Sequence, residues 1–169
     1  MGLFKRNPFG HILFLKTWLI RIAGIITHRR YRSFNELHIE GSEIIRSLPD
    51  TNVLFISNHQ TYFADVVAMF HVFNASLSGR TDSIKNVGYL WQPKMNMYYV
   101  AAKETMQDNL LTKVLAYAGS VSVERTWRAK GKDVTEKKEI NPNDTENIGI
   151  ALNDGWLITF PQGTTKSFK

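Results

Sequence analysis

A histidine and a carboxylate stand six positions apart in the stretch SNHQTYFAD, residues 57–65. His59 could act as a general base, and Asp65 could hold its second ring nitrogen, fixing the tautomer and stabilising the imidazolium formed on proton transfer. The chain has no cysteine and no G-x-S-x-G motif. The pair would therefore activate a substrate hydroxyl rather than an enzyme nucleophile.

Two simpler interpretations of this pair remain open. His59 could be an ordinary hydrogen-bonded loop residue, and Asp65 could serve only the dipole of a following helix. A metal site would need a third ligand, and His71 is the nearest histidine that follows. Because His71 lies about 240° around a helix from Asp65, the two do not converge, and we expect no metal here.

The pair lies between two apolar segments that predict regular structure. The run NVLFIS (52–57) predicts a strand with apolar residues on both faces, as in a buried parallel sheet, and residues 62–74 predict a helix. Hydrophobic periodicity predicts further strands at 97–103, 120–125 and 156–160, short strands at 37–40 and 86–90, and helices at 42–48, 108–119 and 144–155.

This alternation of strands and helices predicts an α/β fold with a mixed, largely parallel sheet flanked by helices. In such sheets the active site lies outside the carboxyl ends of the strands. The segments that follow the four main strands are SNHQT, AKE, ERT and PQGTT. We expect them to form the site.

Positive charge is concentrated at the N-terminus. Residues 1–32 hold seven Lys and Arg and no acidic residue, which more than accounts for the net charge of +6. A nucleic-acid-binding domain would spread such charge over a face, so we expect no nucleic-acid partner. Here it flanks the most apolar segment, GHILFLKTWLIRIAGIITH (10–28), which indicates an anionic membrane surface.

On a helix, this segment has one narrow polar stripe and one wide apolar face. The stripe holds Thr17, Arg21, Gly24 and His28, and the apolar face holds Ile12, Leu13, Leu15, Leu19, Ile20, Ile22, Ile25 and Ile26. Two cations oppose a membrane-spanning helix, so we expect an interfacial helix with Trp18 at headgroup depth and Lys16 snorkelling. An amphipathic helix packed on a core is the alternative.

Three short blocks, in order, resemble the glycerolipid acyltransferases, in particular the 1-acylglycerol-3-phosphate acyltransferase (PlsC-like) group. SNHQTYFAD resembles the block N-H-x-x-x-x-D, GSVSVER (119–125) resembles G-x-[IV]-x-[IV]-x-R, and FPQGTT (160–165) resembles F-P-E-G-T-R. YVAAKE (99–104) is similar to the strand and lysine that precede the second block. The resemblance covers about residues 56–164.

The resemblance implies roles for individual residues. His59 would take a proton from the acceptor hydroxyl, which attacks an acyl thioester of coenzyme A or acyl carrier protein, and Asp65 would orient His59. Arg125 would contact the acceptor phosphate. The remaining substrate-binding residues would be Asn58, Lys103, Phe160, Pro161, Gln162, Gly163 and Thr164. The acyl carrier is a co-substrate, and no further cofactor or metal is implied.

The chain departs from the family pattern at several points. Five residues separate His59 from Asp65 where the family has four, so the extra residue must be absorbed within residues 60–63 if the pair is to form. Gln162 replaces a glutamate and Thr165 an arginine. The charge changes keep open a different lysolipid or an amino-lipid acceptor, and a non-catalytic membrane-binding module of this fold is a further alternative.

Together these observations predict a membrane-associated enzyme at the cytoplasmic face, with lysophospholipid, acyl carrier and bilayer as partners. We expect a membrane-associating arm at residues 1–32 and an acyltransferase domain at 33–169. Because the chain stops directly after the third block, where the family continues, we expect the domain to lack its C-terminal part.

Overall fold

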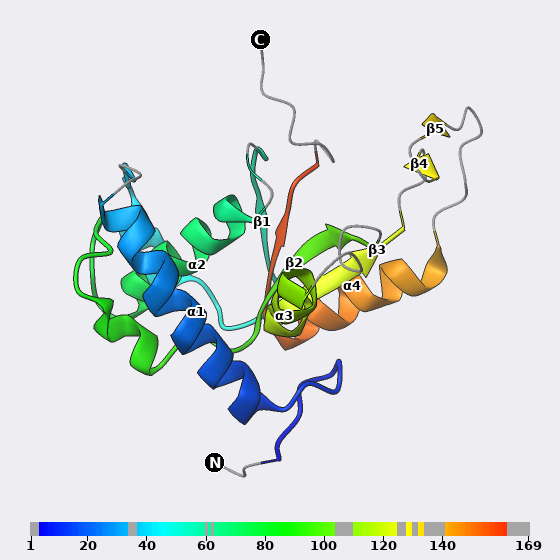
Figure 1. Cartoon of the computed structure of the whole chain (residues 1–169), viewed down its shortest axis with the longest axis horizontal. Helices are drawn as coiled ribbons and strands as arrows, with labels where there is room; N and C mark the ends of the chain where they lie inside the picture. The colour runs from blue at the N-terminus through cyan, green and yellow to red at the C-terminus, as the bar shows by residue number, and fades with distance from the viewer. Residues whose placement is uncertain are drawn as a thin grey trace.

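The computed structural model describes residues 4–33, 37–59, 61, 63–103, 110–124, 128–129, 132–133 and 141–161. Within this part of the chain a four-stranded sheet, parallel throughout, has the order β1-β6-β2-β3. Its strands are β1 (Val53–Ile56), β2 (Met97–Ala102), β3 (Ser120–Val123) and β6 (Trp156–Thr159). A separate antiparallel pair, β4 (Arg128–Ala129) and β5 (Lys132–Asp133), stands away from the body (Figure 1).

Helices cover both faces of the parallel sheet. They are α1 (Leu13–Ser33), α2 (Ala64–Leu77), α3 (Leu110–Gly119) and α4 (Pro142–Asp154), with 3-10 helices η1 (Ser42–Ser47) and η2 (Val87–Trp91). The prediction of an α/β fold with a largely parallel sheet flanked by helices is confirmed.

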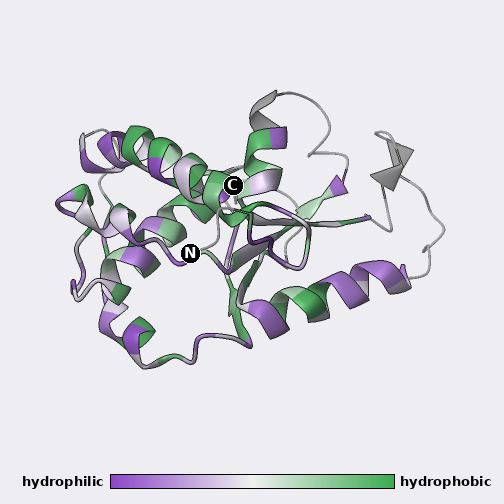
Figure 2. Ribbon diagram, turned by 90° about the horizontal axis from the view of Figure 1, so that it is seen from below, coloured by the Kyte–Doolittle hydropathy of each residue, from purple (hydrophilic) through white to green (hydrophobic). Residues whose placement is uncertain are grey.

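Alternation along the strands divides the core into two layers. On one face Met97, Tyr99, Trp156 and Ile158 pack with Phe73 of α2. The opposite face packs against α4, where the buried cluster comprises Tyr98, Val121, Ala151 and Leu157. α4 carries both hydrophobic and hydrophilic residues (Figure 2), and it packs on the sheet through Ile148, Ala151 and Leu152.

Local sequence signals fix the ends of two helices. The side chain of Asn141 caps α4 by accepting a hydrogen bond from the Asn143 amide at 3.0 Å, and Pro142 follows in the first turn. Gly119 ends α3 with φ +140°, and a Cβ at this position would meet the Met97 carbonyl oxygen at 2.4 Å. Only glycine tolerates both this φ and this contact, and the predicted end of the helix at residue 119 is confirmed.

Three sequence-based predictions of strands need correction. Residues 37–40 do not form a strand, and the segment expected as a strand at 86–90 is instead the 3-10 helix η2. β1 is not buried on both faces, because it lies at the edge of the sheet beyond β6. Its two faces differ sharply: Val53 and Phe55 pack on the core, whereas Leu54 is 48% and Ile56 68% exposed.

The polar stripe of α1 faces the protein. His28 Nε2 lies 2.8 Å from the carbonyl oxygen of Ile84, and Thr27 Oγ1 lies 2.9 Å from His71 Nε2 on α2. A Cβ at Gly24 would lie 2.7 Å from the side chain of Leu90 in η2. These contacts pack the helix on the domain through its polar residues.

Lys16 does not snorkel, contrary to the prediction. Its side chain is fully buried, with Nζ 4.8 Å from the centre of the Tyr98 ring. Ile20, predicted on the apolar face, is also buried, at 6% exposure. The predicted face was therefore too wide, because one side of it packs on the domain.

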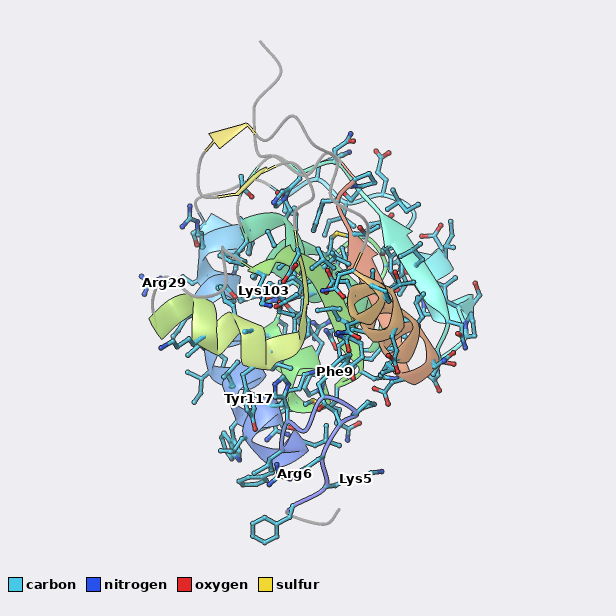
Figure 3. The ribbon with its side chains drawn as sticks, turned by 90° about the vertical axis from the view of Figure 1, so that its right-hand side faces the viewer. Lys5, Arg6, Phe9, Arg29, Lys103 and Tyr117 are labelled. Atoms are coloured by element: carbon cyan, nitrogen blue, oxygen red, sulfur yellow. The ribbon has the colours of Figure 1, made fainter. Side chains whose placement is uncertain are left out.

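The opposite side of α1 is apolar and exposed. Its outward-facing large side chains are Phe14, Leu15, Trp18, Ile22, Ile25 and Ile26. Lys5 and Arg6 precede the helix and Arg29 lies near its other end, so cations flank the stripe at both ends (Figure 3). Among the described residues, no helix meets the length and hydropathy needed to cross a bilayer.

Candidate active site

His59 lies in the loop between β1 and α2, three residues beyond the end of the strand. Its Nδ1 is 3.0 Å from Oδ2 of Asp65, and the two side chains are 16% and 24% exposed. Asp65 belongs to the first turn of α2, where a carboxylate interacts favourably with the helix dipole. The two side chains are therefore within hydrogen-bond distance of each other, as the predicted pairing requires.

Most of the residues between His59 and Asp65 precede the helix. α2 starts at Ala64, so four of the five intervening residues lie outside it. A residue inserted within the helix would have rotated Asp65 by about 100°. The absorption predicted for residues 60–63 is therefore consistent with the observed pairing.

Thr61 fixes the carboxylate from the other side. Its backbone N donates to Asp65 Oδ2 at 3.0 Å, and its hydroxyl donates to Oδ1 at 2.8 Å. Thr61 was not among the predicted site residues. Its signal was a threonine four positions before an acid in the first helical turn, where a short acidic side chain can accept hydrogen bonds from nearby backbone and hydroxyl donors.

Phe160 brings the third sequence block onto the first. Ile56 pairs with Thr159 in the parallel β1–β6 ladder, so the residues following both strands leave the sheet together (Figure 1). The ring of Phe160 stacks on that of His59, with centroids 4.4 Å apart and planes 29° from parallel. Stacking restricts the rotation of the imidazole that Asp65 holds at Nδ1. Pro161 follows in an exposed turn.

Lys103 and Glu124 form an ion pair at the ends of β2 and β3. Nζ of Lys103 is 3.1 Å from Oε1 of Glu124, and the side chains are 55% and 45% exposed. The Glu124 amide donates to Asp144 Oδ2 at 2.8 Å, which ties this end of β3 to the first turn of α4. The sequence predicted Lys103 as a binding residue but not its acidic partner.

The other predicted binding residues have different outcomes. Asn58 is exposed beside His59. Arg125, Gln162, Gly163 and Thr164 lie outside the described residues. The roles assigned to all site residues stay predictions, whereas the proximity of His59, Asp65 and Phe160 is a structural fact.

No metal-binding cluster of three or more histidine or acidic side chains occurs in the part of the chain that the structure describes. His71, considered above as a third ligand, is fully buried away from Asp65, with Nδ1 2.7 Å from the Tyr89 hydroxyl. The arrangement at the strand ends is a histidine, a carboxylate within hydrogen-bond distance of its ring and an aromatic ring stacked on it. Comparison of the chain with family models, with curated proteins and with solved structures gave no match.

Proposed function

We propose that the protein is an O-acyltransferase that moves a fatty acyl group from a thioester of coenzyme A or acyl carrier protein to the hydroxyl of a lysophospholipid. The acceptor that best fits the sequence resemblance is 1-acylglycerol-3-phosphate, which would place the reaction in phospholipid biosynthesis. The observation that carries the proposal is the hydrogen bond between His59 Nδ1 and Asp65 Oδ2 at a strand end.

This pair supports a direct transfer. With Nδ1 held by Asp65, Nε2 of His59 takes the proton from the acceptor hydroxyl as its oxygen attacks the thioester carbonyl. The new C–O bond forms, the C–S bond breaks, and the proton passes to the departing thiolate. Asp65 stabilises the imidazolium between these two proton transfers.

Recognition of the acceptor phosphate is assigned to the ends of β2 and β3. A guanidinium fork at Arg125 would match phosphate oxygens, and Lys103 would add a point charge. A second candidate is an amino-lipid acceptor. The carboxylate of Glu124, which pairs with Lys103 at 3.1 Å, favours it because that carboxylate could instead receive an ammonium group.

We place the enzyme on the cytoplasmic face of a membrane, docked through the exposed stripe of α1. Two tryptophans support this surface: Trp18 of α1 and Trp91 of η2 are 46% and 69% exposed. The Arg21 guanidinium carbon lies 5.3 Å and 5.4 Å from their ring centres. Exposed indole rings beside an arginine suit the headgroup region of a bilayer.

The function is tested by acyl transfer with radiolabelled acyl-CoA, repeated with acyl carrier protein as donor, and lysophosphatidic acid as acceptor. We expect His59→Ala to abolish turnover and Asp65→Asn to reduce it strongly. His38→Ala, at an exposed histidine paired with Glu40, is the matched control and should retain activity. Equal transfer by the wild-type and His59→Ala proteins would exclude the proposed base.

The acceptor is tested in the same assay. Lysophosphatidic acid, a lysolipid without phosphate and a lysolipid with a primary amine are supplied in turn. A preference for the amine that is lost in Glu124→Gln would favour the second candidate. Absence of transfer to every acceptor, with liposome binding intact, would favour a non-catalytic membrane-binding module.

A further inference from the structure

Tyr31 connects α1 to the beginning of α2. The residue lies in the last turn of α1 and is only 6% exposed, within the core cluster that includes Ala75 and Leu90. Its hydroxyl donates a hydrogen bond to the backbone carbonyl of Ala64, the first residue of α2. A side chain of the helix that carries the exposed apolar stripe thus reaches the element that carries Asp65.

The bonded carbonyl belongs to the same peptide unit as the amide nitrogen of Asp65. Because a peptide unit is planar and stiff, fixing the Ala64 oxygen also fixes the nitrogen and Cα of Asp65. The Asp65 carboxylate then meets Thr61 and His59 at hydrogen-bond distances of 2.8–3.0 Å. Two hydrogen bonds and the short covalent segment from the Ala64 carbonyl to the Asp65 carboxylate therefore connect the Tyr31 hydroxyl to the ring that we assign as the base.

The electrostatics of Tyr31 fit this arrangement. Burial raises the pKa of its phenol, Arg30 opposes the rise, and the negative charge of Asp65 adds to it. Tyr31 therefore keeps its proton and stays a donor.

We propose that Tyr31 is a positioning residue for the His59–Asp65 pair, acting through the Ala64–Asp65 peptide unit. Its kinetic consequence rests on the proposed acyl transfer, whereas its structural consequence does not. Removing the hydroxyl frees the first turn of α2, so the Asp65 carboxylate and the His59 ring lose their fixed geometry.

The test compares Tyr31→Phe with Tyr99→Phe in the full chain. Tyr99 is a matched control, because it is equally buried at 6% and its hydroxyl also donates to a helix carbonyl, that of Leu115 in α3. The His59 ring is followed by NMR of ¹³C-histidine-labelled protein, with His59→Gln for assignment and the exposed His38 as internal reference. Acyl transfer and thermal melting are measured on the same samples.

We expect both variants to melt about 3 °C lower than wild type, since each loses one buried hydrogen bond. Only Tyr31→Phe should shift the His59 ring resonances, and only Tyr31→Phe should lower kcat, by about tenfold with KM unchanged. An unmoved His59 signal in Tyr31→Phe, or equal changes in the two variants, would overturn the proposal. If wild type transfers no acyl group, the acyltransferase assignment fails, and the NMR comparison alone decides the role of Tyr31.

Discussion

Thr61 and Asp65 are joined by two hydrogen bonds, from the Thr61 amide to Oδ2 at 3.0 Å and from its hydroxyl to Oδ1 at 2.8 Å. With His59 Nδ1 also 3.0 Å from Oδ2, both carboxylate oxygens are engaged. An aspartate held at both oxygens has little freedom to rotate. The orientation of the imidazole therefore depends on a threonine as well as on the aspartate itself.

Replacement of Thr61 by valine should lower kcat by about fivefold to tenfold, because it removes the hydroxyl donor while keeping the side-chain shape and the backbone donor. Thr61→Ser should stay close to wild type. Thr17→Val, which removes a hydroxyl bonded to the Leu13 carbonyl on α1, serves as control. Steady-state acyl transfer checks the series, and equal activity of the serine and valine variants would contradict the role of the hydroxyl.

An acidic residue in the exposed stripe of α1 should weaken membrane binding. Ile25→Asp places a charge at a side chain that is 57% exposed, and the lost apolar burial predicts at least about tenfold weaker binding to vesicles containing anionic lipid. Ile44→Asp in η1, where the isoleucine is 62% exposed, is the matched control. Vesicle co-sedimentation measures both, and equal losses would show that α1 is not the docking surface.

Acid should loosen the contact between α1 and α2. Burial lowers the pKa of His71 to about 4, and neighbouring His28 acts in the same direction. Because this pKa lies below the unfolded value of 6.5, the unfolded chain binds the proton first as the pH falls. The stability contributed by neutral His71 is therefore present above about pH 6.5 and is lost toward pH 4.

When the pH falls from 7 to 5, protonation linked to His71 should lower the free energy of unfolding by about 2 kcal/mol. His71→Gln should show a correspondingly shallower pH dependence. His38→Gln, at an exposed histidine, should follow wild type. Urea unfolding at the two pH values gives the comparison, and parallel curves for wild type and His71→Gln would refute the assignment.

Replacement of Lys16 by methionine should stabilise the protein at pH 7. Burial lowers the Lys16 pKa to about 8, against an opposing influence of Asp154, and Nζ has no hydrogen-bond partner among the described residues. The cost of the buried charge is fully present below about pH 8 and disappears above the unfolded value of 10.5. Relieving it should add about 2 kcal/mol at pH 7.

This gain should shrink as the pH rises toward 10. Lys94→Met is the control, because Lys94 is also buried but bonds to Asp50 at 3.2 Å, so its loss should not stabilise the fold. Unfolding free energies of both variants at pH 7 and pH 10 test the prediction. A Lys16→Met protein less stable than wild type at pH 7 would show that the cation makes a net favourable contribution.

The sequence predicted local structure well wherever the signal was local. Hydrophobic periodicity predicted the strands β2 and β3, and the end of the helical pattern at residue 119 predicted the end of α3. The position of β1 at the sheet edge could not be predicted, because its neighbour in the sheet is β6, which lies about a hundred residues later in the sequence. For the same reason the contacts of the polar stripe of α1 could not be predicted, since its partners Ile84, Leu90 and His71 are distant in sequence.

The candidate site likewise has one part that the sequence predicted and one part that it did not. The rule that sites lie at the carboxyl ends of parallel strands predicted that the regions of His59 and Phe160 would meet, and the two rings are stacked. The contacts of Glu124 and Tyr31 were not predicted. Nothing in their local sequence indicates that one pairs with Lys103 and the other reaches Ala64, since both contacts depend on packing between separate elements.

The order of the sheet has a consequence for how the protein is made. β6 is the latest of the four parallel strands along the chain, yet it lies between β1 and β2. During synthesis β1 therefore has no partner in this sheet until residues 156–159 have left the ribosome, and the stack of Phe160 on His59 cannot form earlier. α1 emerges well before that point. If α1 docks on a bilayer as we propose, the nascent chain would reach the membrane through its apolar stripe before His59 and Phe160 come together at the strand ends.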